Sequence, residues 1–471
     1  MKKSRYAGLA APVLAANILP LFFVNCGSFA AAAAAAAPAP PAGTPIPTPT
    51  AAGVLPTPKA VLCQTATRPP SDSWQLVAPA DVVYTAAIAT DPFSTGTIWM
   101  SARNADDSGA KGRGGLFKST DCGAPGSWTW VTDPANRANN ANSARMVNRM
   151  WTWSMAMDFL TPGTIYLEDN YAQSGDGPEP NGLSKSTDFG KTWKKVIDLG
   201  DRIPAVVNGK THGTGQVPNV ASVSMDPTDP LHLVVGAHDD CPNPGYPVCQ
   251  PESFDGGRTW RLLQLDPKNS FPNTNIGGAW QEQSGPLVLN HTSWLFTGTF
   301  NTPWLTTDSA QTFTSISSNT SYIGIFSSGG GEWTTQPMAP STLGYYYLAS
   351  RQSPGIIYSK DAKTWVEIPN VLPRSISQAP TYFPQYSDVA FGGGRVLLGD
   401  AVTGYVIWAN EPVPPMTWAD TAKIASYWHI LPTTGLSATP SGGAYFLKYD
   451  DVNHILYASR GNPRMSRIYI P

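Results

Sequence analysis

Residues 186–193 read Ser186-Thr-Asp188-Phe-Gly190-Lys-Thr192-Trp193, and residues 253–260 repeat the pattern as Ser253-Phe-Asp255-Gly-Gly257-Arg-Thr259-Trp260. Three looser copies occur around them. We call the five segments the aspartate turns, after Asp121, Asp188, Asp255, Asp308 and Asp361. Neighbouring aspartates are 67, 67, 53 and 53 residues apart. Five copies of one pattern at such regular spacing indicate a protein built from internal repeats.

Each aspartate turn has the composition of a tight hairpin connection. Apolar, strand-like residues precede it, as at 115–117, and others follow its aromatic residue, as at 262–263. The carboxylate of such an aspartate accepts hydrogen bonds from backbone N–H groups of the turn, glycine permits a positive φ, and the aromatic ring packs between hairpins. We therefore expect the five aspartates to be structural and not catalytic.

A second repeat, seven copies long, lies upstream of the aspartate turns and continues beyond the last one. Its strand-like units are residues 96–99, 163–166, 232–235, 293–296, 344–347, 395–398 and 454–457. Several follow an Asp-Pro turn, for example at Asp91 and Asp226. Four short antiparallel strands repeated seven times, without helical periodicity, predict an all-β fold, a single seven-bladed β-propeller. The last unit lacks an outer strand, and we expect residues 73–77 near the N-terminus to close that blade.

The aspartate turns resemble the Asp-boxes, also called BNR repeats, of a superfamily of β-propellers. That superfamily includes sialidases, sortilin-type receptors, photosystem assembly factors and two-propeller xyloglucanases. The resemblance implies an exported propeller that acts on extracellular carbohydrate, as a glycoside hydrolase. Residues 202–204, Arg-Ile-Pro, resemble the element that carries one arginine of the sialidase site, so a sialidase-like enzyme is an alternative. Sialidases place this element before the first box, whereas here it follows the second.

The first 58 residues predict export and a tether. Residues 1–30 have the order of a secretory signal peptide, with basic residues first, then an apolar run, then small residues. Residues 31–58 are rich in Ala, Pro and Thr and predict an extended linker, which leaves 59–471 for the propeller. We expect a protein that is secreted, or held in the periplasm or cell envelope. Lipid attachment at Cys26 is the alternative to a simple signal peptide.

Four cysteines remain after the signal, an even number in an oxidising compartment. Cys241 and Cys249 bracket a loop rich in Pro and Gly, and we expect a disulfide between them. Cys63 and Cys122 are left as a pair by elimination alone.

Charge and motif content exclude several partners. Lys and Arg number 31 against 33 Asp and Glu, which is not the basic composition of a nucleic-acid-binding protein. No segment after residue 30 has the roughly 18 apolar residues that span a bilayer. The glycine motifs that bind phosphates or dinucleotides do not occur, and the cysteines form no Cys-x-x-Cys pair of a structural zinc site, so we expect no cofactor and no catalytic metal. A structural Ca²⁺ held by His238, Asp239 and Asp240 stays open.

The candidate site lies on the face opposite the aspartate turns. Loops after the second and fourth strands of each blade open on that face, and several are long, among them 199–219. Polar residues just past the second strands should ring the central channel there. We expect Asp169 and Asp400 to supply the two carboxylates of glycoside hydrolysis. Six further residues are expected to bind the ligand: Arg103, Glu168, His238, Asp239, Arg351 and Arg460.

Two classes of function remain open at this point. The first is a glycoside hydrolase whose partner is a polysaccharide or glycoconjugate. The second is a non-catalytic binding or assembly scaffold of the cell envelope, in which the charged residues of the channel only neutralise one another. Acids about 5 to 10 Å apart in an open groove favour the enzyme, whereas acids paired with arginines at a closed mouth favour the scaffold.

Overall fold

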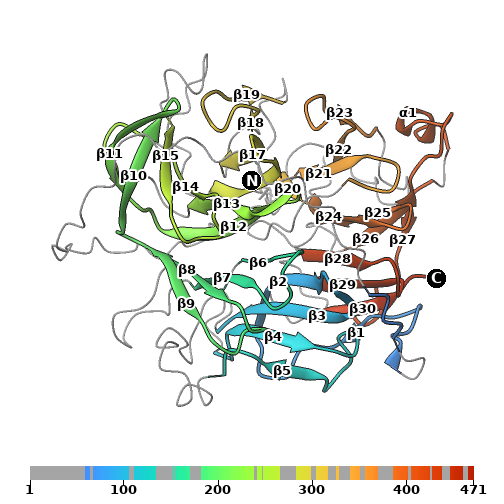
Figure 1. The fold of residues 1–471 in the computed structure, drawn as a ribbon. Helices are drawn as coiled ribbons and strands as arrows, with labels where there is room; N and C mark the ends of the chain where they lie inside the picture. The colour runs from blue at the N-terminus through green and yellow to red at the C-terminus, as the bar shows by residue number, and fades with distance from the viewer. Residues whose placement is uncertain are drawn as a thin grey trace, which may run out of the picture. The chain divides into compact units, whose positions relative to one another are not determined.

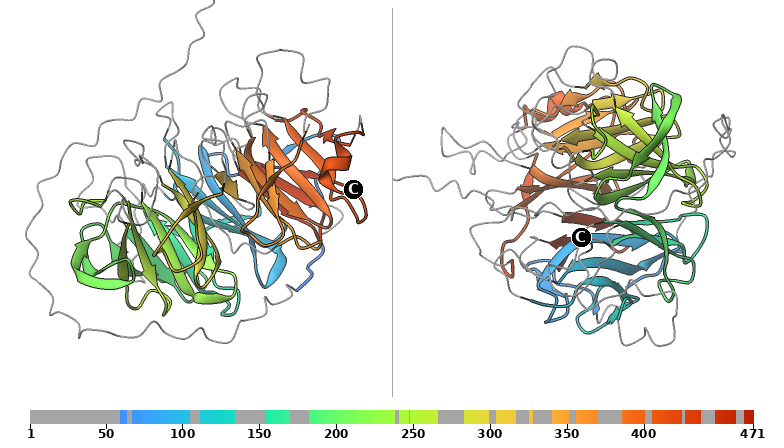
Figure 2. Two further views of the ribbon diagram at one scale, coloured as in Figure 1. Left: turned by 90° about the horizontal axis from the view of Figure 1, so that it is seen from above. Right: turned by 90° about the vertical axis from the view of Figure 1, so that its left-hand side faces the viewer.

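Seven sheets, here called blades 1 to 7, follow one another along the chain and form a seven-bladed β-propeller (Figure 1). Further views are given in Figure 2. The computed structural model describes residues 59–63, 67–104, 111–133, 152, 154–169, 182–237, 241–246, 248–265, 283–298, 304–316, 325–327, 340–350, 356–369, 386–400, 405–424, 427–436, 446–459 and 465–471. The sequence prediction of an all-β, seven-bladed propeller is therefore confirmed.

Blades 1 to 3 contain the first three aspartate turns, each between the third and the fourth strand. Blade 1 consists of β2 (Tyr84–Asp91), β3 (Ser94–Arg103), β4 (Gly115–Ser119) and β5 (Trp128–Trp130). Blade 2 consists of β6 (Met155–Met157), β7 (Ile165–Asp169), β8 (Gly182–Ser186) and β9 (Lys194–Asp198). Blade 3 is built on β12 (Val220–Asp226), β13 (Asp229–Ala237), β14 (Val248–Ser253) and β15 (Arg261–Leu265).

Blades 4 to 7 follow the same order. Blade 4 consists of β16 (Gln283–Asn290), β17 (Ser293–Gly298), β18 (Trp304–Thr306) and β19 (Thr314–Ser315). Blade 5 consists of β20 (Ile325–Ser327), β21 (Tyr346–Ser350), β22 (Ile356–Ser359) and β23 (Val366–Glu367). Blade 6 consists of β24 (Tyr386–Gly392), β25 (Arg395–Asp400), β26 (Val406–Asn410) and β27 (His429–Ile430). Blade 7 consists of β28 (Phe446–Asp450), β29 (Ile455–Ser459), β30 (Ser466–Tyr469) and β1 (Gln75–Leu76).

Blade 7 joins the two ends of the propeller sequence. The N-terminal strand β1 pairs with β30, with Gln75 opposite Arg467 and Leu76 opposite Ser466. The prediction that an N-terminal strand supplies the missing outer strand of the last blade is confirmed. The paired part is two residues long, shorter than the expected 73–77.

Blade 3 has two strands more than the repeat predicts. β10 (Arg202–Val207) and β11 (Lys210–Gln216) form a hairpin at its outer edge, where β10 pairs in parallel with β15. Figures 1 and 2 show this hairpin in green at the periphery of the blade. The expectation that 199–219 is a loop is therefore wrong. β11 is mostly polar and exposed, so its sequence has none of the apolar alternation that marks a strand.

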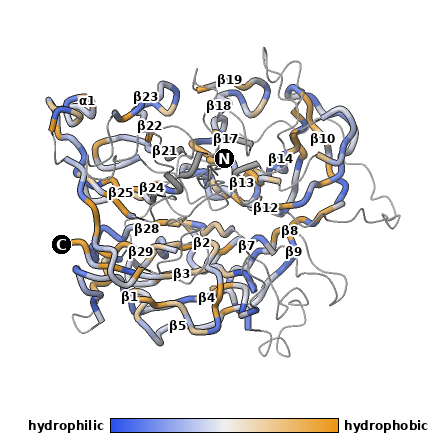
Figure 3. Tube along the Cα trace, turned by 180° about the vertical axis from the view of Figure 1, so that it is seen from behind, coloured by the Kyte–Doolittle hydropathy of each residue, from blue (hydrophilic) through white to orange (hydrophobic). Residues whose placement is uncertain are grey.

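Both faces of each blade are buried against its neighbours. Seven hydrophobic clusters in the described residues fill the junctions between consecutive blades, including the junction of blade 7 with blade 1. In β3, Ile98 belongs to the cluster shared with blade 7, and the next residue, Trp99, to the cluster shared with blade 2. Successive strand residues point to opposite faces, so a strand buried on both faces reads as continuously apolar. Hydrophobic residues accordingly recur along the blade strands (Figure 3).

The aspartate turns are held by their own side chains. In blade 3, Asp255 Oδ1 accepts hydrogen bonds from the backbone N–H groups of Arg258 (2.9 Å) and Thr259 (2.8 Å), and Oδ2 accepts the Thr259 hydroxyl (2.7 Å). Ser253 Oγ accepts the N–H of Gly257, whose φ is +81°. The turns of Asp188, Asp308 and Asp361 have closely similar bonds.

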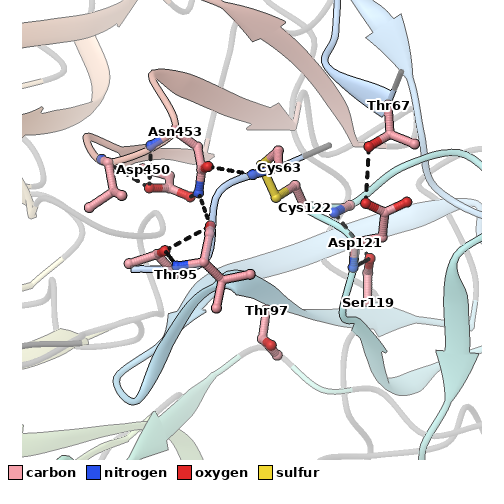
Figure 4. Close-up of a disulfide and its surroundings, with 12 residues drawn as sticks. Cys63, Thr67, Thr95, Thr97, Ser119, Asp121, Cys122, Asp450 and Asn453 are labelled. Carbon is pink, nitrogen blue, oxygen red and sulfur yellow. Dashed lines mark hydrogen bonds between the residues drawn. A yellow bond between two sulfur atoms is a disulfide. The ribbon is translucent and has the colours of Figure 1, made fainter. Parts of the chain in front are cut away.

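The turn of Asp121 differs because the N-terminal segment crosses it. Asp121 accepts the Thr67 hydroxyl at 3.0 Å, and the next residue, Cys122, forms a disulfide with Cys63. Figure 4 shows this disulfide between blade 1 and Asn453 of blade 7, whose side-chain oxygen accepts the Cys63 N–H at 2.8 Å. The second disulfide, Cys241–Cys249, is also present.

The described residues contain one helix, α1 (Trp418–Thr421), whose Trp418 packs between blades 5 and 6. Within the described part of the chain, no helix is long and apolar enough to cross a membrane.

Candidate functional site

The second strands of the seven blades end at one rim, opposite the aspartate turns. Their last residues are Arg103, Asp169, Ala237, Gly298, Ser350, Asp400 and Ser459. Antiparallel connectivity explains this arrangement, because the first and third connections of every blade lie on one face and the second on the other. Asp169 and Asp400 therefore end β7 and β25 on the same face.

Two of the predicted rim residues have described side chains, and both are buried. Arg103 is 6% exposed, and its guanidinium carbon lies 4.4 Å from the ring centre of Tyr84, its partner across β2 and β3. Glu168 in β7 is fully buried. Both side chains are thus shielded from solvent near the ends of β3 and β7.

For Asp169 and Asp400 the structure describes the backbone only, and the other predicted residues lie outside the described part of the chain. Asp169 pairs with Gly182 across β7 and β8, and Asp400 pairs with Tyr386 across β25 and β24. His238, Asp239, Arg351 and Arg460 lie outside the described residues, as does Asp240. The catalytic role of Asp169 and Asp400, and ligand binding by the other six residues, stay predictions.

Polar side chains on the inner strands tie consecutive blades together. Asp388 in β24 accepts the N–H of Val389 (2.8 Å) and the N–H of Leu447 in blade 7 (2.7 Å). Ser154, just before β6, accepts the N–H of Val223 in blade 3 at 3.1 Å. All of these residues are buried. Side-chain-to-backbone bonds between blades fix the relative positions of the strands whose ends form the rim.

Arg202, which begins the segment that resembles a sialidase element, lies elsewhere. It is the first residue of β10, in the outer hairpin of blade 3, and it is exposed. It is not at the end of a second strand.

A second polar cluster lies at the first turn of blade 3, on the face of the aspartate turns. His232 is fully buried between two carboxylates, with Nδ1 3.0 Å from Asp226 Oδ2 and Nε2 3.0 Å from Glu252 Oε1. The other oxygen of Glu252 binds Arg261, with Nη2 at 2.5 Å. The four side chains form a continuous chain of alternating charge, and each carboxylate in it is paired.

The charge of His232 follows from these contacts. Burial acts to lower its pKa, but the hydrogen bonds to Asp226 and Glu252 outweigh burial and raise the pKa to about 9. Burial acts to raise the pKa of Asp226, but its hydrogen bonds from His232 and Thr228 keep that pKa below the usual value. Contacts with two carboxylates therefore favour the protonated form of His232.

His291, in the first turn of blade 4, faces this cluster. Its ring centre lies 4.9 Å from that of His232, and the residue is 8% exposed. Neither ring nitrogen has a hydrogen-bond partner among the described residues, and Nδ1 lies 4.0 Å from Asp229 Oδ2. Burial and the nearby positive His232 both lower the pKa of His291. One potential ligand atom from each of Asp226, His232 and His291 lies within 4.8 Å of the others.

The sequence pattern predicts a turn at Asp226 and a strand at His232, and it does not predict that they form a cluster. Glu252 is twenty residues from His232 and His291 fifty-nine, so no local motif connects them. The one hint in the sequence is that His232 and Glu252 lie in buried strands of blade 3, in which most other residues are apolar.

Comparison with known proteins identifies distant relatives. No protein-family model matches the chain. A xyloglucanase from Paenibacillus sp is 25% identical over 292 residues, 60% of this chain and 26% of the relative. Xyloglucanase Xgh74A from Acetivibrio thermocellus is 25% identical over 195 residues, 40% of this chain and 21% of the relative. The chain thus spans about a quarter of the first relative's length and about a fifth of the second's.

Among solved structures, YCF48 from Cyanidioschyzon merolae is similar with a TM-score of 0.50 at 11% identity, over 84% of this chain and 98% of that one. This likeness shows the fold.

Proposed function

We propose that this protein is an exported propeller that hydrolyses an extracellular polysaccharide. The observation that carries the proposal is the sequence similarity to a xyloglucanase over 292 residues. The aspartate turns, which we propose to be Asp-boxes, are consistent with it. Residues 1–30 and 31–58 serve in this proposal as export signal and linker, and residues 59–471 as the propeller.

The rim supplies the chemistry in this proposal. Asp169 and Asp400 end β7 and β25 on one face. One carboxyl group would protonate the glycosidic oxygen as general acid, and the other would act as nucleophile or activate a water molecule. Retaining enzymes hold the two carboxyl groups about 5 Å apart and inverting enzymes about 6.5 to 9.5 Å, so the separation decides the stereochemistry. Arg103 and Glu168, buried behind the rim, would hold the strand ends in place.

A non-catalytic carbohydrate-binding or assembly protein is the second candidate. The observation that favours it is the burial of Arg103 and Glu168. Charged side chains that are this buried are less accessible to a ligand than the predicted ligand-binding role requires. If the other charged side chains of the rim are buried as well, the protein would bind a partner through its loops without performing hydrolysis.

Sugar release from polysaccharides tests the enzyme. The purified protein is incubated with xyloglucan and with other plant, bacterial and sialylated polysaccharides, and reducing ends and free sialic acid are measured. Asp169→Asn and Asp400→Asn are compared with Asp72→Asn, an exposed aspartate before β1. Release that either rim substitution abolishes and Asp72→Asn preserves supports the enzyme and its acids.

The other outcomes of this experiment also distinguish between the candidate functions. Release that both rim substitutions leave intact retains hydrolysis and rejects Asp169 and Asp400 as its acids. Absence of release from every substrate, together with retention of the protein on a polysaccharide in affinity electrophoresis, supports the second candidate. Release confined to sialic acid supports the sialidase-like alternative.

A further inference from the structure

Blade 3 differs in sequence from blades 1 and 2 at two positions, His232 and Glu252, whose side chains are in contact. Strand registers align the blades residue by residue, counted from the aspartate of each first turn. The equivalent positions in blades 1 and 2 hold Thr97 and Thr164 in place of His232, and Lys118 and Lys185 in place of Glu252. The repeat requires neither histidine nor glutamate at these positions. Their joint presence in one blade, in contact at 3.0 Å, indicates a local function.

The donor set of this cluster suits a transition-metal ion. His232 Nδ1 and Asp226 Oδ2 lie 3.0 Å apart, close to the roughly 3.4 Å that separates two ligands of one tetrahedral Zn²⁺ with bonds of about 2.1 Å. His291 supplies a third nitrogen within 4.8 Å of both atoms. His291 is 8% exposed, and its ring nitrogens have no hydrogen-bond partner among the described residues, so coordination would not break a hydrogen bond.

The surroundings of His232 also match those of a metal ligand. A histidine that ligates through one nitrogen usually donates its other N–H to a carboxylate, which fixes the ring orientation. Glu252 Oε1 lies 3.0 Å from His232 Nε2 and can accept this bond. Arg261 binds the other oxygen of Glu252 and neutralises it, so Glu252 stays in place when His232 carries no charge. The carboxylate of Glu252 thus directs Nδ1 of His232 toward Asp226 and His291.

We propose that Asp226, His232 and His291 form a binding site for a divalent transition-metal ion such as Zn²⁺. Two imidazoles and a carboxylate select such ions over Ca²⁺ or Mg²⁺, which prefer oxygen ligands. Coordination by His232 Nδ1 replaces the proton that Nδ1 shares with Asp226, and that proton passes to solvent. Asp229, whose Oδ2 is 4.0 Å from His291 Nδ1, is the nearest further carboxylate for a fourth position.

The ion would connect two blades. Asp226 and His232 belong to blade 3, and His291 belongs to the first turn of blade 4. All three residues are at least nine-tenths buried, so the site would be structural and not catalytic. It lies on the face opposite Asp169 and Asp400, so its existence does not depend on the proposed hydrolysis.

Metal titration of the full chain tests the proposal. Tag-free protein is stripped with a chelator, dialysed, and titrated with Zn²⁺ and separately with Ca²⁺ by calorimetry. We expect one Zn²⁺ per chain and no comparable binding of Ca²⁺. His291→Ala should weaken Zn²⁺ binding roughly tenfold or more. This variant should fold, because His291 holds no hydrogen bond in the described structure. His212→Ala, at an exposed histidine in the outer hairpin, is the matched control and should bind like the unmodified chain.

A second variant and a spectroscopic readout separate the site from adventitious binding. Glu252→Gln keeps an acceptor for His232 but removes the charge, and it should weaken Zn²⁺ binding about 10- to 100-fold. Co²⁺ in place of Zn²⁺ should give visible absorption bands that are lost in His291→Ala. Absence of Zn²⁺ binding would overturn the proposal. Binding that His291→Ala leaves unchanged, or that His212→Ala weakens equally, would also overturn it.

Discussion

Arg467 in β30 shows how a single buried side chain holds distant segments of the propeller. It is fully buried, and its guanidinium donates to three groups: the carbonyls of Cys122 and Thr67 and the side-chain oxygen of Gln75. Cys122 belongs to blade 1, Thr67 to the N-terminal segment, and Gln75 to β1 of blade 7. A planar guanidinium can serve several acceptors at once, which a lysine ammonium on a flexible stem does less well.

We expect Arg467→Met to lower the free energy of unfolding by about 1 to 3 kcal/mol, because the Thr67 carbonyl loses its guanidinium donor and the Cys122 carbonyl keeps only the Tyr457 hydroxyl. Arg467→Lys should recover only part of this loss. Urea denaturation followed by tryptophan fluorescence measures both changes. Arg68→Met is the control, since Arg68 is exposed and only covers the ring of Tyr469; it should change stability by no more than about 0.5 kcal/mol. Equal losses at the two arginines would contradict the assignment.

At the scale of the element, the aspartate turns divide into two kinds. Asp255 accepts two backbone N–H groups and the Thr259 hydroxyl, so it satisfies donors that the hairpin cannot satisfy itself. Asp121 instead accepts the Thr67 hydroxyl from the N-terminal segment. We expect Asp255→Ala to cost about 1 to 2 kcal/mol, as the loss of a capping carboxylate does in a helix, and Asp121→Ala to cost less. Paired urea denaturation curves check the order, and the reverse order would refute it.

The aspartate turns should also make the protein sensitive to acid. The backbone N–H groups of Thr364 and Lys363 lower the pKa of Asp361 to about 2, from 3.8. For Asp188, Asp255 and Asp308 burial acts to raise the pKa, but the hydrogen bonds of the turn outweigh it. A carboxylate whose pKa is lower in the folded state stabilises the fold fully above its unfolded pKa and loses this effect as pH falls.

We therefore expect the free energy of unfolding to decrease as pH falls from about 4 toward about 2. Urea denaturation at successive pH values measures this decrease. Asp361→Asn has no titrating carboxyl group at this position, so its stability should change less over the same range. An unmodified chain whose stability stays flat through this range would show that the turns do not carry the effect, and a variant with the same slope would exclude Asp361.

The outer hairpin marks the limit of prediction from sequence at this scale. The strands of the blades alternate between two buried faces, so their apolar residues predict them. β11 has no such residues, and β10 pairs with β15 in parallel across more than fifty residues of chain. Strands that are held by long-range backbone pairing, with few buried side chains, leave little pattern in the sequence.

At the scale of the whole molecule, repetition explains both the success and the failure of prediction. Seven copies of one strand unit fix which strand ends share a face, so Asp169 and Asp400 could be assigned to one rim from the sequence. The cluster of Asp226, His232 and His291 depends on the contact between two blades and on the register of β13 with β14, which the repeat does not encode. A site that breaks the repeat is therefore found only once the blades are aligned in space.

Closure of the ring depends on the N-terminal segment, which crosses from blade 1 to blade 7 before β1 pairs with β30. The Cys63–Cys122 disulfide secures this segment and closes a loop with a sequence separation of 59 residues. The Cys241–Cys249 disulfide lies within blade 3 and has a separation of only 8. The loop-entropy relation gives about 4 kcal/mol for the first disulfide and about 2.5 kcal/mol for the second, since a longer loop restricts the unfolded chain more.

We expect the double variant Cys63→Ser/Cys122→Ser to lose more stability than Cys241→Ser/Cys249→Ser, by about 1 to 2 kcal/mol in urea denaturation. Hydrogen exchange distinguishes ring closure from a general loss of stability. In the first variant, amides of β1 and β30 should exchange faster than those of β12 and β13, because the N-terminal segment no longer holds the edge of blade 7. In the second variant, β1 and β30 should stay as protected as in the unmodified chain. Equal stability losses with unchanged protection of β30 would mean that the strand pairing alone closes the ring.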